Sequence, residues 1–157
     1  MATSNMMVKP TNKIVLDSNG LHSQVMKVEN ATNMYPGRAV GAGTNDDDCV
    51  VGAAVTTTGI IGFIGYEQMH KLNRPATVDT IHTVNSQVPI LWGPGAVIVA
   101  RLHSGVTAVK GSLLTPVHDG MLTGGTGGTD DIVATSEETV SSVAITAGVD
   151  CLVKLRI

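Results

Sequence analysis

The chain has 157 residues, of which 43% are hydrophobic, 15% charged and only 3% aromatic. Its formal net charge of −3 argues against a basic nucleic-acid-binding protein, and its apolar content argues against disorder. No apolar run approaches the roughly 18 residues that a membrane span requires. Valine, threonine and isoleucine supply 21, 18 and 10 residues, and such β-branched side chains favour strands. We therefore expect one soluble all-β domain.

The first 24 residues differ from the rest, because polar residues there separate short apolar patches. Pro10 and the Asn19-Gly20 pair break any helix, so we expect residues 1–24 to form an extended N-terminal arm. The arm is either a frayed terminus or a segment that orders against a neighbouring molecule. Its apolar patches favour the second alternative and give these contact candidates: Met6, Met7, Val8, Ile14, Val15 and Leu16.

From residue 25 to 157, short apolar runs alternate with turn signals about every ten residues, which predicts a small barrel or sandwich. The expected strands are 25–29, 38–40, 49–55, 59–67, 87–91, 96–102, 106–110, 112–114, 132–135, 140–146 and 152–157. A helical turn fits only within 66–75. The glycine-rich stretch 121–131 predicts a mobile surface loop. The last strand is apolar to its end, so we expect it to pair in a sheet or at an interface.

No pattern typical of a catalytic site is found. The Gly-rich run 124–129 is followed by Asp130 and Asp131, where a phosphate loop would need a lysine and a helix. The run 46–48 of three aspartates lacks the later glutamate of a calcium loop, so we expect a solvated turn. The five histidines lack metal-ligand spacing, although folding could bring His82 and His103 together. We expect no catalytic residue, no metal and no cofactor.

Three further side chains are notable because they are rare in the chain. Cys49 and Cys151 are expected to be buried, reduced thiols, although their spacing alone leaves a disulfide open. The N-terminal residues lack the apolar segment of a secretory signal, which favours a reducing compartment. Trp92 is the only tryptophan and precedes a Gly-Pro-Gly turn at 93–95, as a core residue or as an interface anchor.

Four phrases of the sequence carry a resemblance to a known family. They are VENATNMYPGRAV (28–40), IIGFIGYE (60–67), VNSQVPILWGPGAVIVARLHSGVTAVKGSLL (84–114) and VDCLVKLRI (149–157). Together they resemble the capsid decoration, or cement, proteins of tailed double-stranded DNA viruses. In that group a VPIL-like strand precedes a glycine turn and an apolar strand ending in Arg-Leu. The resemblance covers about residues 25–157 and implies a small β-barrel of the β-tulip type.

The resemblance also implies a function without chemistry. It implies a homotrimer on the outer surface of an icosahedral viral head, made in the host cytoplasm, that clamps neighbouring major capsid protein subunits. Neither nucleic acid nor membrane would be a partner. The six apolar arm residues would then contact the shell, and Trp92 would be a trimer contact. Two alternatives are a trimeric all-β nucleotide hydrolase, similar to deoxyuridine triphosphatase, and a surface adhesion or carbohydrate-binding module.

Overall fold

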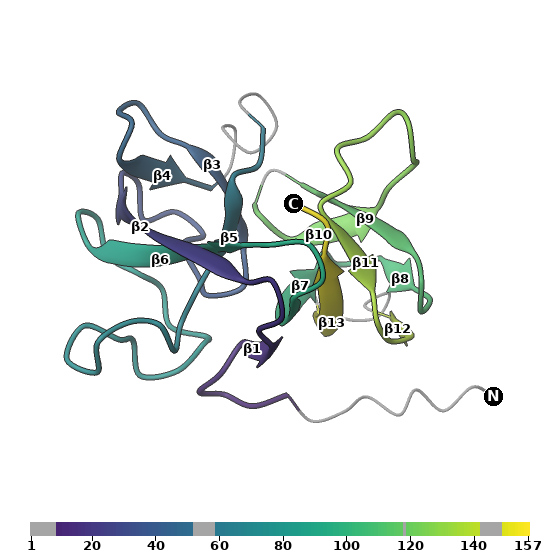
Figure 1. The fold of residues 1–157 in the computed structure, drawn as a ribbon, viewed down its shortest axis with the longest axis horizontal. Coiled ribbons are helices and arrows are strands. Elements are labelled where there is room, and N and C mark those ends of the chain that lie inside the picture. Colours follow the sequence, from purple (N-terminus) through teal and green to yellow (C-terminus); the bar gives the residue numbers. More distant parts are fainter. Residues whose placement is uncertain (1–8, 52–58, 118, 142–148) are drawn as a thin grey trace.

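The computed structural model describes residues 9–51, 59–117, 119–141 and 149–157. Every regular element in these ranges is a β-strand, and the strands form two small barrels that lie side by side (Figure 1). The predicted all-β class and small-barrel architecture are confirmed. The division of the strands after residue 25 into two barrels was not predicted from the sequence.

The first barrel is closed in the order β2-β4-β3-β5-β6. Its strands are β2 (His22–Val28), β3 (Ala39–Ala42), β4 (Asp48–Val50), β5 (Gly62–Ile64) and β6 (Gln87–Trp92). The longest pairing joins β2 to β6 in antiparallel register from His22↔Trp92 to Lys27↔Gln87. The connection between β5 and β6, residues 65–86, leaves the barrel as the longest described segment without a strand. We call it the excursion.

The second barrel closes because β7 pairs with both β10 and β13. Its strands are β7 (Val97–Leu102), β9 (Leu113–Pro116), β10 (Leu122–Gly124), β11 (Ala134–Ser136) and β13 (Val149–Leu155). The short strand β1 (Val15–Asp17) adds to β7. A separate two-stranded sheet contains β8 (Thr107–Ala108) and β12 (Val140–Ser141).

Two adjacent strands supply both hydrophobic cores, because successive side chains of a strand point to opposite faces. On β5 and β6, the paired residues Ile64 and Ile90 lie in the core of the first barrel. The neighbouring pair, Phe63 and Leu91, lies in a larger core that includes Ile98 of β7. The first barrel therefore packs against the second through its own wall, and the larger core takes side chains from both barrels.

The link between the barrels is the predicted glycine turn at 93–95. Gly93 has a positive φ of 133°, and a side chain there would collide with the carbonyl oxygen of Gly20. Glycine is therefore required where β6 leaves the first barrel and the chain passes close to the residues before β2. From this turn the chain enters β7 of the second barrel.

The structure corrects two local predictions and confirms a third. The segment 121–131, expected to be a mobile loop, begins with β10, whose Leu122 is fully buried. The segment 66–75 forms turns rather than a helical turn. The last strand is paired as expected, since β13 lies between β7 and β11.

Candidate binding surfaces

The described part of the predicted N-terminal arm is fastened to the folded body. The ammonium of Lys9 lies 2.5 Å from the Glu138 carboxylate, and both side chains are largely buried. The Thr11 carbonyl accepts a hydrogen bond from the Val78 amide. Residues 9–17 therefore follow the second barrel and contact the excursion of the first, instead of extending away from the protein.

This placement corrects two of the six proposed shell contacts. Ile14 and Val15 are only 1% and 7% exposed, because both side chains belong to the core of the second barrel. An apolar pair in a polar segment fits a core strand as well as an intermolecular contact, and here β1 pairs with β7. Leu16 is 40% exposed and stays available for contact. The other candidates, Met6, Met7 and Val8, lie outside the described residues.

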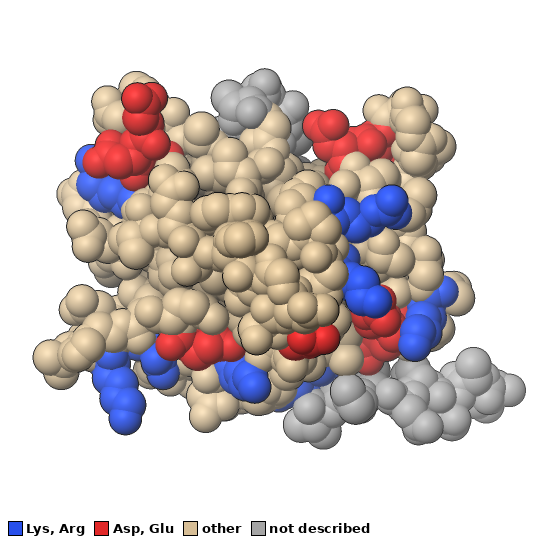
Figure 2. All heavy atoms as spheres, viewed as in Figure 1, with Lys and Arg blue, Asp and Glu red and all other residues tan. Residues whose placement is uncertain are grey.

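Trp92 is half-buried at the end of β6 and stacks on His22 of β2, with ring centroids 6.0 Å apart. The first half of β2, from His22 to Val25, is exposed, and Val25 is 62% exposed. Figure 2 shows this side of the molecule, where the coloured Lys, Arg, Asp and Glu residues lie around a broad uncharged centre. We call this surface, which includes His22, Ser23, Gln24, Val25 and Trp92, the uncharged face.

The uncharged face also presents a strand edge. On β2, the Val28 amide donates a hydrogen bond to the Ser86 carbonyl, next to β6. The Lys27 amide donates to the Asp47 carbonyl, on the opposite side of the strand. The backbone N–H and C=O groups of successive residues in a strand point to opposite sides. Ser23 and Val25 lie two and four residues before Lys27, so their N–H and C=O groups also point away from β6. The pairing of β4 with β2 involves only Lys27 and Val28. Among the described residues, the β2 edge at Ser23 and Val25 therefore carries no paired strand.

A cavity of about 330 Å³ lies where the β2–β3 connection, β7 and β13 meet the excursion. Its lining residues include ion pairs of opposite charge: the Arg101 guanidinium lies 3.4 Å from the Asp150 carboxylate and 3.8 Å from the Asp79 carboxylate. The buried Arg38 donates a hydrogen bond to the Asp119 carbonyl and lies over the Tyr35 ring. Burial lowers the pKa of Arg38 below its usual value, and nearby Asp119 acts in the opposite direction. The cavity is thus a charge-balanced junction.

A second cavity, of about 340 Å³, lies beside the glycine-rich segment that suggested phosphate binding. Its lining includes Asp130 and Asp131 together with the apolar Ile60, Ile132 and Ile157. The Asp130 carboxylate also accepts a hydrogen bond from the Thr126 amide, which closes the loop on itself. Carboxylates at this position repel a phosphate, so the geometry disfavours the nucleotide-hydrolase alternative at this loop.

The two cysteines are separate, buried free thiols, as predicted. Cys49 lies in the core of the first barrel and Cys151 in the core of the second. Burial raises the pKa of the Cys49 thiol to about 12 and that of Cys151 to about 11. Thiols of this kind are poor nucleophiles at neutral pH.

Among the other candidate polar residues, His103 and Asp48 have polar or charged side-chain partners. His103 pairs with Asp119 at 3.7 Å, whereas His82 is buried in the excursion. The described residues contain no group of three or more His, Cys, Asp or Glu side chains that is suited to a metal ion. Of the three aspartates expected in a solvated turn, Asp48 is instead buried, with Asn45 2.6 Å and Lys27 2.9 Å away.

The excursion carries three large apolar side chains that are exposed to solvent. Leu72 is 88% exposed, and Ile81 and Val84 are also exposed. Leu72 and Ile81 border a small cavity of about 170 Å³, which Arg74 and His82 also line. Apolar side chains exposed around a concave site are typical of protein contact surfaces. This surface was not predicted from the sequence, although the long interval without an expected strand and its single arginine are visible there.

None of the described elements is a helix that could cross a membrane. No family model matches the chain, and no curated protein matches it. Among solved structures, the N base of the head fiber gp8.5 of bacteriophage phi29 is similar in backbone, with a TM-score of 0.49 and 12% sequence identity. The match covers 87% of this chain and 94% of that chain.

Proposed function

We propose that this chain is a capsid decoration protein, which binds the outer surface of an icosahedral viral head and stabilises the assembled shell. The observation that carries the proposal is a protein-contact surface, the uncharged face across the exposed half of β2 and the end of β6, through which copies of the chain would assemble on the shell (Figure 2). Protein interfaces are depleted of charge at their centres and enriched in tryptophan. One of the phrases that resemble cement proteins, residues 84–114, contains β6 and Trp92.

In this proposal the chain does no chemistry. A protein that binds the assembled shell more tightly than its free subunits stabilises the shell by mass action, and many copies on one particle multiply the effect. The barrels supply a rigid body for such a clamp, since the larger hydrophobic core takes side chains from both of them. The partner is the major capsid protein, and the protein is located on the virion exterior.

The proposal includes a homotrimer. The half-buried Trp92, its stacked partner His22 and the unpaired β2 edge offer a surface that a second copy of the chain could cover. Covering such an edge protects it from unspecific pairing. Leu16 and the excursion are then available for the shell, and Met6, Met7 and Val8 are proposed as further shell contacts.

Cosedimentation with purified, expanded heads of the virus that encodes the chain tests this function. We expect saturable binding by the wild-type protein, and the absence of binding would overturn the proposal. Val25→Asp, in the uncharged face, is expected to reduce the trimer fraction measured by light scattering. The matched control is Val109→Asp, since Val109 is similarly exposed (57% against 62%) and lies next to β8, in the separate two-stranded sheet.

A further inference from the structure

The small cavity in the excursion has a size that suits a single side chain. Its volume is about 170 Å³, whereas sites for cofactors and drug-sized ligands measure roughly 300–1,000 Å³. Its lining combines the side chains of Arg74 and His82 with threonines, Ser86 and the exposed Leu72 and Ile81. The chain therefore offers polar groups within an apolar rim.

Two buried nitrogen atoms of the lining residues have no hydrogen-bond partner in the protein. They are Nε of Arg74 and Nε2 of His82. His82 is only 2% exposed, and its backbone amide is held by the Met34 carbonyl. A buried donor without an acceptor is costly, and such groups are rare in folded proteins. The pair indicates a site that an acceptor from another molecule completes.

The Arg74 side chain is fixed in place by contacts of its other guanidinium atoms with the protein. Its Nη2 donates to the carbonyls of Glu67 and Met69, at 2.7 and 2.8 Å. Its guanidinium also lies over the ring of Tyr66, 5.3 Å from the centroid. These contacts fix the plane of the guanidinium, so Nε–H is pre-oriented for a further acceptor.

The positive charge of Arg74 has no carboxylate counterpart. All 13 Asp and Glu residues of the chain lie in the described ranges, and none of them forms an ion pair with Arg74. The carbonyl oxygens that it contacts are dipoles, which leave the net charge in place. A guanidinium with free N–H groups matches a carboxylate better than any neutral acceptor.

We propose that this cavity receives the carboxylate of an aspartate or glutamate side chain from the protein on which the chain docks. The inference rests on the proposed function, in which that protein is the major capsid protein. The carboxylate accepts hydrogen bonds from Arg74 Nε–H and from His82 Nε2–H. The rim residues Leu72 and Ile81 pack against apolar atoms around the incoming side chain.

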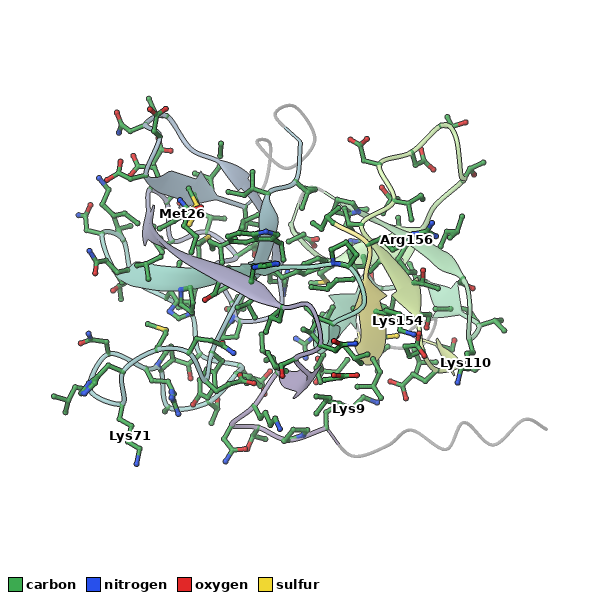
Figure 3. The ribbon with its side chains drawn as sticks, in the orientation of Figure 1. Lys9, Met26, Lys71, Lys110, Lys154 and Arg156 are labelled. Atoms are coloured by element: carbon green, nitrogen blue, oxygen red, sulfur yellow. The ribbon has the colours of Figure 1, made fainter. Side chains whose placement is uncertain are left out.

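Head binding by three variants tests the contact. Arg74→Gln is expected to weaken binding by about tenfold or more, because the partner's carboxylate is then buried without a positive charge beside it. His82→Phe, which keeps a ring but removes the donor, is expected to weaken it less. Lys71→Gln is the matched control: it removes the same charge from a residue that points away from the body (Figure 3), and less than about a threefold change is expected.

Leu72→Glu gives a test that does not depend on the folding of Arg74→Gln, since Leu72 is almost fully exposed. A carboxylate at the rim repels the incoming one, so head binding is expected to fall by at least about fivefold. If the wild type binds heads and both Arg74→Gln and Leu72→Glu bind equally well, the carboxylate contact is overturned while the decoration function stands.

A measurement without heads separates the two proposals. In nitrogen-15 NMR spectra, sodium acetate is expected to shift Arg74 Nε–H saturably, and acetamide is expected to leave it unchanged. If the wild-type protein fails to bind heads, the proposed function is wrong. The acetate titration still tests whether the cavity binds a carboxylate. Absence of an acetate response, as for a cavity that holds water only, overturns the assignment. A stronger response to phosphate than to acetate overturns it too.

Discussion

Glu67 and Val15, 52 residues apart, are joined by a 2.7 Å hydrogen bond from the Val15 amide to Oε1 of the carboxylate. The second oxygen, Oε2, accepts from the Ile14 amide at 3.0 Å. One side chain of the excursion thus holds the start of β1, where Ile14 and Val15 enter the core of the second barrel. The N-terminal segment is therefore a strap between the two barrels, which explains why Ile14 and Val15 are not surface residues.

Glu67→Gln is expected to destabilise the protein, because an amide side chain offers one acceptor where two backbone donors need one each. We expect a loss of about 1–3 kcal/mol in the free energy of unfolding, measured by urea denaturation. The control is Glu137→Gln, which removes a partly exposed pair with Lys154 and should cost at most about 1 kcal/mol. Equal effects of the two variants would contradict the role of Glu67 as the fastening of the strap.

Ile14→Ala tests the corrected position of the apolar pair. Truncation of a buried isoleucine creates a cavity, so we expect a loss of about 2–5 kcal/mol in the free energy of unfolding. Leu16→Ala, at a residue that is 40% exposed, should cost less than about 1 kcal/mol. Comparable losses in the two variants would place residue 14 on the surface, as the sequence alone had suggested.

His82 makes stability depend on pH in a defined window. Burial lowers its pKa from 6.5 to about 4, so between these values the unfolded chain binds a proton that the folded protein does not. Stability is therefore expected to fall as pH decreases from about 6.5 towards 4, by about 1–3 kcal/mol from this residue. Urea denaturation of wild type and His82→Phe at several pH values measures the difference. A difference that is constant with pH would contradict the prediction.

Cys49 and Cys151 are expected to resist alkylation in the folded protein. Their raised pKa values leave almost no thiolate at pH 8, and both side chains are buried in different cores. Mass spectrometry after iodoacetamide treatment should show an unmodified native protein and two modifications after unfolding in urea. Rapid labelling of either thiol at pH 8 without denaturant would show that its core opens readily.

The strand content was predictable from local patterns, whereas the pairing was not. The alternation in residues 96–102 and 152–157 predicts β7 and β13, yet only the structure pairs these distant strands to close a barrel. The short strand β10 was missed because two glycines follow Leu122 and Thr123, and glycine is typical of loops. Tertiary pairing outweighs that local preference.

The candidate surfaces were predictable in part. Trp92 was recognised because it is the only tryptophan, and its stack on His22 depends on the β2–β6 register. No local signal separates the buried pair Ile14–Val15 from the exposed Leu16, since all three are adjacent apolar residues. Likewise, the exposure of Leu72 beside Arg74 and His82 follows from turns in the excursion that have no periodic pattern.

Electron cryomicroscopy of expanded heads, with and without added protein, shows whether the chain decorates the shell. We expect additional density on the outer surface that accommodates three copies of the two-barrel body, with the excursion facing the shell. Heads that stay bare at saturating protein concentration would contradict the claim. Density inside the head would contradict it as well.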